Sequence, residues 1–188
     1  GVKVVAIPAT IDNDLGGSDY TIGFNTALTT IVEAIDKLRD TSSSHQRCSI
    51  VETMGREGGD LALYAGVCGG AEFIVTPKHR IDKEYMIETL TKWKKEGRRH
   101  AIIVTTEKIF NVYELAEEIS ERSGFATRAT VLGYIQRGGA PVPQDRILAT
   151  QLGSYATQLA VEGETGIGVG IKNDELTHSK ITDIFKEA

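Results

Sequence analysis

Residues 48–60 read CSIVETMGREGGD, and this stretch decides the fold class of the chain. A short apolar strand at 48–53 passes through a glycine-containing turn straight into a helix at 60–68, and that succession is typical of parallel α/β sheets. Glycines at such a junction let backbone N–H groups approach an anion, and Arg56 stands where it could clamp a phosphate. A generic strand-to-helix turn without any ligand is the other interpretation that this segment leaves open.

The same alternation continues on both sides of this stretch. Short runs rich in Val and Ile alternate with segments of helical period, so the pattern predicts an α/β fold with a parallel sheet. The predicted strands are 2–7, 48–53, 73–76, 101–105, 131–135 and 168–171. The predicted helices are 21–39, 60–68, 82–96, 111–123 and 144–161. Both chain ends are abrupt, and the apolar periodicity Ile181, Ile184, Phe185 at the end suggests a piece of a longer protein.

Composition excludes several classes of function. A net charge of -5 and a pI near 5.4 argue against nucleic-acid or anionic-membrane binding. Cys48 and Cys68 have no CxxC partner, so we expect reduced, buried thiols, and the histidines lack the spacing of a zinc site. No secretory leader and no run of 18 or more apolar residues is present, which predicts a cytoplasmic location.

Residues 7–15, IPATIDNDL, place Asp12 and Asp14 at i, i+2 after an apolar strand. In an extended segment these carboxylates share a face, so one could accept a proton while the other holds a metal, as phosphoryl transfer requires. Two alternatives stay open on this segment alone. An Asp-Asn-Asp run before Gly16-Gly17 also suits a simple turn, and aspartate-nucleophile phosphatases likewise carry aspartates at i, i+2 after a strand.

Further candidates stand near other predicted strand ends. Arg137, in the glycine-rich segment 136–139, is well placed for a sugar phosphate because ligands of open α/β sheets collect at the carboxyl ends of strands. Glu107 could accept a hydrogen bond from a sugar hydroxyl, although a solvated glutamate is the simpler interpretation. Arg128 lies nine residues before Arg137, at the other end of the strand, so it would serve a different site or a neighbouring subunit.

Several motifs together closely resemble the 6-phosphofructokinases of bacterial type, in that family's order and spacing. They occupy residues 8–14, 21–24, 34–41, 54–56, 69–72 and 131–139. The resemblance covers essentially the whole chain, so it displaces the turn and phosphatase alternatives. It implies a three-layer parallel-sheet sandwich, with 1–23 and 136–188 as parts of a nucleotide-binding domain and 24–135 as a sugar-phosphate domain. It also implies transfer of the ATP γ-phosphoryl to the 1-hydroxyl of fructose 6-phosphate, Mg²⁺ with ATP, and a cytoplasmic homotetramer of glycolysis.

The resemblance assigns roles to individual residues. Asp12 would be the base that takes the hydroxyl proton, with Thr10 and Arg56 as further catalytic groups and Asp14 orienting the base and the magnesium environment. The family's substrate-binding positions correspond to Thr10, Asp12, Arg47, Met54, Gly55, Arg56, Glu107, Arg128, Tyr134 and Arg137. Among these, Arg47 and Arg128 match arginines that reach in from an adjacent subunit.

Departures from the family pattern matter as well. Tyr134 stands where the best-known members have a phosphate-binding histidine, and a phenol carries no positive charge near neutral pH. Positions that bind an allosteric nucleotide in regulated members correspond to Arg39, Gly70, Glu72, Arg98 and His100. Glu96, however, replaces a cation of those members, and a charge reversal opposite phosphate is unfavourable.

The family's Gly-Gly-Asp-Gly donor loop falls before Gly1, so the isolated chain is expected to have negligible kinase activity. Two alternatives remain for the function. A pyrophosphate-dependent relative typically carries Lys where this chain has Ala9, and the small residue favours ATP. A noncatalytic sugar-phosphate-binding module would have no need of Asp12 as a base.

Overall fold

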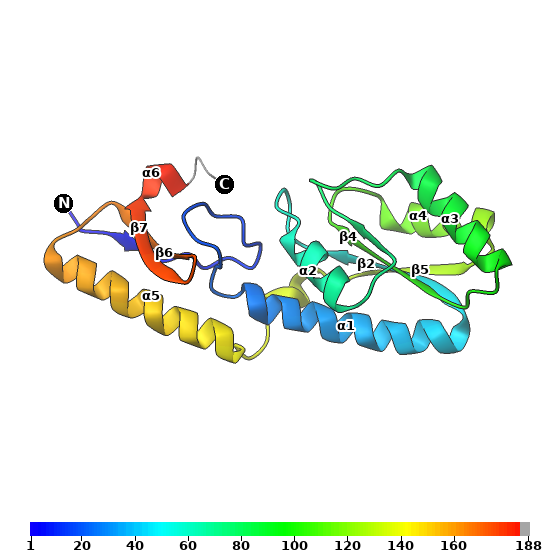
Figure 1. The fold of residues 1–188 in the computed structure, drawn as a ribbon, viewed down its shortest axis with the longest axis horizontal. Helices are drawn as coiled ribbons and strands as arrows, with labels where there is room; N and C mark the ends of the chain where they lie inside the picture. Colours follow the sequence, from blue (N-terminus) through cyan, green and yellow to red (C-terminus); the bar gives the residue numbers. More distant parts are fainter. Residues whose placement is uncertain (185–188) are drawn as a thin grey trace. The chain divides into compact units, whose positions relative to one another are not determined.

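A computed structural model describes residues 1–184 of the chain, which forms two compact units (Figure 1). Unit 1 contains Gly1–Ala27 and Gly139–Ala188, and unit 2 is Leu28–Gly138. The elements in chain order are β1 (Val5–Ala6), α1 (Phe24–His45), β2 (Arg47–Thr53), α2 (Asp60–Cys68), β3 (Phe73–Val75), α3 (Lys83–Lys95), β4 (Ala101–Thr106), α4 (Val112–Ser123), β5 (Ala126–Val131), the 3-10 helix η1 (Gly133–Arg137), α5 (Pro143–Glu162), β6 (Ile167–Lys172), β7 (Glu175–Lys180) and α6 (Ile181–Ile184).

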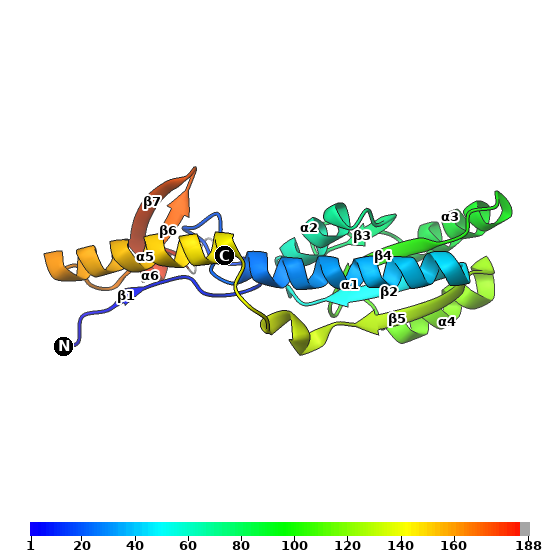
Figure 2. The ribbon, with the colours of Figure 1, turned by 90° about the horizontal axis from the view of Figure 1, so that it is seen from below.

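Unit 2 is built on a parallel sheet with the strand order β3-β4-β2-β5. Helices α3 and α4 pack on one face, and α1 and α2 lie against the other, which gives the three layers seen in Figures 1 and 2. Every residue of the central strand β4 is buried, as expected for a parallel strand covered on both faces. The predicted α/β class with a parallel sheet is therefore confirmed.

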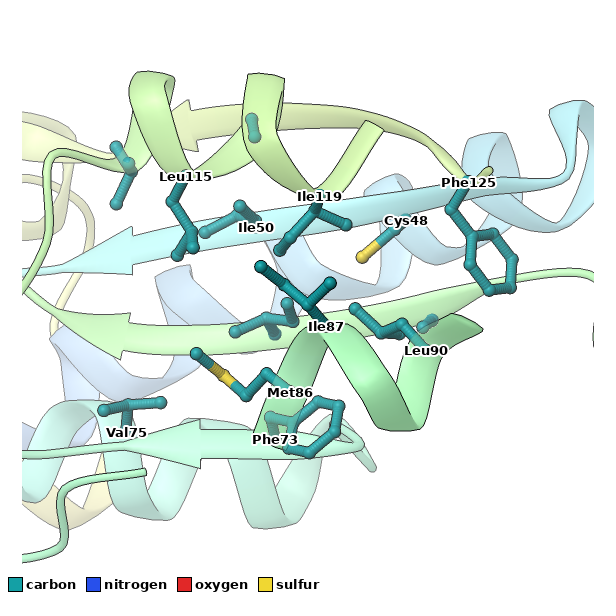
Figure 3. Packing of buried hydrophobic residues seen from close by; sticks show 14 residues of the cluster. Cys48, Ile50, Phe73, Val75, Met86, Ile87, Leu90, Leu115, Ile119 and Phe125 are labelled. Carbon is teal, nitrogen blue, oxygen red and sulfur yellow. The ribbon is translucent and has the colours of Figure 1, made fainter. Parts of the chain in front are cut away.

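The main core of unit 2 lies between the sheet and the pair α3 and α4 (Figure 3). Ile50 of β2 lies close to Ile87 and Ile119 from the two helices. Ile103 of β4 belongs to the same buried cluster. Cys48 is part of this core, and burial raises the pKa of its thiol to about 12, so it stays protonated. Cys68 is unpaired as well but exposed, so the prediction that both thiols are buried is wrong for this one.

Unit 1 holds a smaller sheet in the order β1-β6-β7, parallel between β1 and β6 and antiparallel between β6 and β7. Leu148, Leu152 and Leu159 of α5 pack on Ile167 and Val169 of β6. Strand β7 was not predicted, because its residues are mostly exposed and polar. The signal for it is the turn at Asn173 and Asp174, where positive φ values of 51° and 63° suit a two-residue hairpin loop.

A buried carboxylate fastens the start of α5 in unit 1. Asp145 is 2% exposed, and its Oδ2 accepts hydrogen bonds from the backbone N–H of Thr26, at 2.8 Å, and from the Thr26 hydroxyl. That hydroxyl oxygen also accepts from the N–H of Val142 at 3.2 Å. Hydrogen bonds of the Asp145 and Thr26 side chains thereby join the first turn of α1 to the start of α5.

The predicted strand at 131–135 is wrong. Strand β5 covers Ala126–Val131 instead, and the segment after it turns into η1. Gly133 adopts a φ of 54°, a left-handed conformation that ends the extended backbone. The helix predicted at 21–39 also starts later and runs on to His45, where the Ser42 hydroxyl meets the Ser49 hydroxyl of β2. Phe185, placed in the terminal apolar pattern, lies outside the described residues.

Candidate functional site

The loop that carries Asp12 is held from within unit 1. Thr21 is fully buried, and its hydroxyl donates to the carbonyl oxygen of Thr10 at 2.6 Å. The Thr21 N–H donates to Asn13 Oδ1 at 2.9 Å, while the N–H of Asp12 donates to the Thr10 hydroxyl oxygen at 3.2 Å. Asp12 and Asp14 are both half-buried. The structure thus brings Thr10, Asp12 and Asp14 together on one short, internally bonded loop.

In unit 2, predicted site residues gather beyond the carboxyl ends of neighbouring strands. Met54, Gly55 and Arg56 follow β2, Glu107 follows β4, and η1 follows β5. Backbone hydrogen bonds continue past the strand ends. The N–H of Glu107 donates to the Thr53 carbonyl oxygen at 2.8 Å, and the N–H of Leu132 donates to the Glu52 carbonyl oxygen at 3.1 Å. Ligands of open α/β sheets bind at this edge, so the placement suits a binding site.

The turn after β2 has an unusual backbone. Gly55 has a φ of 122° and Arg56 a φ of 39°, which is rare for a residue with a side chain. The N–H groups of Gly58 and Gly59 both donate to the Gly55 carbonyl oxygen, at 3.0 and 3.2 Å. A Cβ at Gly59 would lie 2.8 Å from Thr76 Cβ, so glycine is required there. This turn presents the exposed Arg56 at the sheet edge, and strained backbone of this kind is common at functional sites.

Tyr134 and Arg137 stack on each other along η1. The Arg137 guanidinium carbon lies 4.8 Å from the centre of the Tyr134 ring, a cation–π geometry. Tyr134 is 77% exposed, so the ring faces solvent on its other side. Arg137 ends a short helix, a correction to the glycine-rich loop expected after a longer strand.

Arg47 and Arg128 are not brought to this edge within the chain. Arg47 begins β2, seven residues before Met54, so the strand separates them by about 20 Å. Arg128 pairs in register with Ser49, also in the first half of β2, and its Nη1 donates to the Thr127 carbonyl oxygen at 2.9 Å. Its exposed side chain lines a hollow of about 420 Å³ between α4 and β5.

Four of the five candidate effector residues contact one another in two pairs. Arg39 Nη2 donates to the Gly70 carbonyl oxygen at 3.2 Å, and Arg98 Nη2 lies 2.6 Å from Glu72 Oε1. Glu72 Oε2 also accepts from the N–H of Ile102 at 2.6 Å, so that carboxylate is already engaged. A nucleotide phosphate would compete with Glu72 for Arg98. Glu96 is exposed on the turn after α3, and His100 is half-buried before β4.

Two residues that organise the site were not singled out as site residues from the sequence. Thr21 holds the Asp12 loop, as described above. Gln136 is 1% exposed, and its side chain joins η1 to the segment after β2. Both belong to motifs of the family resemblance, which was the available signal.

Glu52 on β2 has an altered acidity. Its pKa is raised, first by burial and second by the negative charge of Glu107. The folded protein therefore holds this proton more tightly than the unfolded chain does. The resulting stabilisation is complete below the ordinary pKa of glutamate and is lost as the pH rises through the higher folded value.

We expect Glu52→Gln to flatten this part of the pH dependence. The variant removes the group that titrates, so its urea midpoint should fall less than that of the wild type between mildly acidic and neutral pH. Urea unfolding of the intact protein across that range measures the difference, with the exposed Glu57→Gln of the next turn as the control. Equal slopes for wild type and Glu52→Gln would show that the strand does not couple the charge of Glu52 to folding.

Magnesium is compatible with the carboxylates of the Asp12 loop. Mg²⁺ is usually held by one or two carboxylates together with substrate phosphates, rather than by an all-protein cage. Asp12 and Asp14 offer such a pair, and within residues 1–184 no cluster of three or more potential ligands from His, Cys, Asp and Glu occurs.

The described helices include none that is long and apolar enough to cross a membrane.

Parallel strands with arginines, a glutamate and a glycine turn beyond their carboxyl ends define an α/β protein with a candidate ligand site at the sheet edge. A family model described as "Phosphofructokinase" matches residues 1–160. The chain belongs to the phosphofructokinase family. It is 53% identical over 186 residues to the "ATP-dependent 6-phosphofructokinase" of Buchnera aphidicola subsp. Schizaphis graminum. The aligned region covers 99% of this chain and 58% of that protein. It is 54% identical over 183 residues to the protein of the same name from Glaesserella parasuis serovar 5, covering 97% of this chain and 57% of that one.

Solved structures agree on the fold. The phosphofructokinase of Saccharomyces cerevisiae superposes with a TM-score of 0.89 at 31% identity, over 98% of this chain and 26% of that one. A pyrophosphate-dependent phosphofructokinase from Marinobacter aquaeolei gives 0.85 at 22% identity, over 97% of this chain and 52% of that one. The second likeness concerns the fold alone. The chain spans less than two thirds of the length of each of these relatives.

Proposed function

We propose that the intact protein containing this chain is an ATP-dependent 6-phosphofructokinase, which transfers the γ-phosphoryl of ATP to the 1-hydroxyl of fructose 6-phosphate in glycolysis. The observation that carries the proposal is an identity above 50% over nearly the whole chain to proteins of that name. The Asp12 loop of unit 1 and the sheet edge of unit 2 supply the residue types that the reaction requires.

Phosphoryl transfer needs an activated hydroxyl and cationic groups that neutralise the charge on the phosphates. Asp12 takes the proton of the 1-hydroxyl as the new O–P bond forms and the bond from the γ-phosphorus to the bridging oxygen breaks, so that ADP leaves. Thr10 positions the reacting groups. The cation of Arg56 stabilises the charge that develops on the transferred phosphoryl. Mg²⁺ bound with ATP would be oriented by Asp14, and it would neutralise phosphate charge.

The sugar phosphate is held by residues of unit 2. Arg137 binds the 6-phosphate and Glu107 accepts a hydrogen bond from a sugar hydroxyl, while Met54 and Gly55 cradle the ring. Tyr134 keeps the Arg137 guanidinium stacked and can donate one hydrogen bond, in place of a histidine cation. Arg47 and Arg128 serve the site of an adjacent subunit, which makes the working enzyme a homo-oligomer, proposed to be a tetramer. We place the enzyme in the cytoplasm.

The proposal is tested by assaying the intact protein with fructose 6-phosphate and either ATP or pyrophosphate. We expect Mg²⁺-dependent formation of ADP and fructose 1,6-bisphosphate with ATP, and no turnover with pyrophosphate. Glucose 6-phosphate serves as the control acceptor, because it carries the same phosphate on a different ring. Turnover with pyrophosphate but not with ATP would show that pyrophosphate is the donor. Binding of fructose 6-phosphate without turnover with either donor would show that the protein is a noncatalytic binding module.

A further inference from the structure

Gln136 is a buried amide in the middle of an exposed turn. Its side chain is 1% exposed, whereas its neighbours Ile135 and Arg137 on η1 are both exposed. Its Oε1 accepts a hydrogen bond from the N–H of Met54 at 3.1 Å, and its Nε2 donates to the Gly133 carbonyl oxygen at 2.9 Å. Both ends of the amide are therefore used, one toward another loop and one toward the start of its own turn.

The Gln136 side chain links the two segments just beyond the point where the pairing of β2 with β5 ends. The pairing of β2 with β5 ends at Glu52 and Val131, and the N–H of Leu132 still donates to the Glu52 carbonyl oxygen. Met54 is buried, at 7% exposure, and its N–H bonds to the Gln136 amide instead of to a backbone carbonyl. A buried N–H without such an acceptor would be costly, so the link is built into the fold.

Residues on either side of the link carry proposed ligand contacts. Met54 opens the segment that includes Gly55 and Arg56, and the Gly133 carbonyl belongs to the turn that ends at Arg137. One amide therefore bonds to both Met54 and Gly133, which adds a side-chain link to the backbone bond between Leu132 and Glu52. The stacking of Arg137 on Tyr134 then orients the guanidinium on a turn whose first residue is already held.

We propose that Gln136 is a positioning residue for the sugar-phosphate site, which holds the segment after β2 and the turn after β5 in one fixed arrangement. The inference rests on the proposed function, because it takes the ligand to be fructose 6-phosphate. Gln136 touches no ligand itself. It acts through the backbone of Met54 and of η1, so its loss should affect use of the sugar phosphate more than use of ATP.

Gln136→Glu is the most informative variant. The carboxylate has the length of the amide and can still accept from Met54, but when ionised it has no proton for the Gly133 carbonyl oxygen. We expect a roughly 10-fold to 100-fold loss in kcat/KM for fructose 6-phosphate, expressed mainly as a higher KM, in the range that a misplaced group causes. The KM for ATP should stay close to that of the wild type. Protonation restores the donor, so the ratio of variant to wild-type kcat/KM should rise as the pH falls.

Two further variants separate positioning from stability. Gln136→Met fills a similar volume with no hydrogen-bonding amide, so it should show the same selective loss without the recovery at low pH. Ser42→Ala removes the buried hydroxyl contact with Ser49 in the same unit, away from the sheet edge, and should leave both KM values unchanged. Circular dichroism and urea unfolding of the intact proteins establish that each variant is folded at the assay temperature.

A selective rise in the KM for fructose 6-phosphate, with recovery of Gln136→Glu at low pH, supports the inference. Folded Gln136 variants with a normal KM for the sugar phosphate overturn it, as does an equal loss for both substrates. If Gln136→Met does not fold, the pH profile of Gln136→Glu decides alone. A wild-type protein that does not phosphorylate fructose 6-phosphate refutes the proposed function first, and this inference with it.

Discussion

Asp12→Asn in the intact protein is expected to lower kcat by about 100-fold or more, the range typical of a lost general base. The 1-hydroxyl must lose its proton as the bond to phosphorus forms, and a carboxamide has no basic oxygen able to take that proton. The side chain keeps its size and can still accept a hydrogen bond. The KM for fructose 6-phosphate should therefore change little, which is the signature of an interaction made in the transition state.

Steady-state kinetics with both substrates varied measures this prediction. Asp36→Asn is a suitable control, because it makes the same chemical change on an exposed position of α1. Asp14→Asn separates the two carboxylates of the loop: its defect should diminish at high Mg²⁺, whereas that of Asp12→Asn should not. Near-normal kcat in Asp12→Asn would remove this residue from the mechanism.

Strong local signals explain which parts of the fold were predictable. Helix α2 begins and ends at the predicted residues, since glycines stand directly before and after it, at Gly59 and Gly69. Strand β4 was correct to within one residue because its apolar run is continuous and buried on both faces. The prediction for the segment after β5 was wrong because Tyr134 and Ile135 favour strands. In the structure, the left-handed conformation of Gly133 ends the extended backbone, and η1 follows.

The candidate site was predictable in its residue types and less so in its supports. Arg56, Glu107 and Arg137 stand beyond strand ends in the sequence pattern, and a parallel sheet places such ends at one edge. Gln136 reaches a partner 82 positions away in the chain, so no local pattern reveals its role. Thr21 likewise acts on Thr10 through a hydrogen bond that only the folded loop creates.

Mixing two inactive variants tests whether active sites are shared between subunits. Asp12→Asn lacks the base, and Arg128→Ala lacks an arginine that the strand register keeps away from the carboxyl edge of its own sheet. If Arg128 serves the neighbouring subunit, some sites of a hybrid oligomer combine an intact base with an intact arginine. Random association of equal amounts would restore about a quarter of the sites in an isologous arrangement. Activity should therefore rise far above that of either variant alone.

The matched control is a mixture of Asp12→Asn with Arg137→Ala. Arg137 follows β5 at the carboxyl edge and is proposed to serve the same site as Asp12 of its own chain. Every site in that mixture keeps one defect, so no recovery is expected. Native mass spectrometry of subunits with different tags shows whether exchange has occurred. With exchange demonstrated, recovery in neither mixture would place Arg128 outside a shared site, and recovery in both would mean that Arg137, too, acts across the subunit boundary.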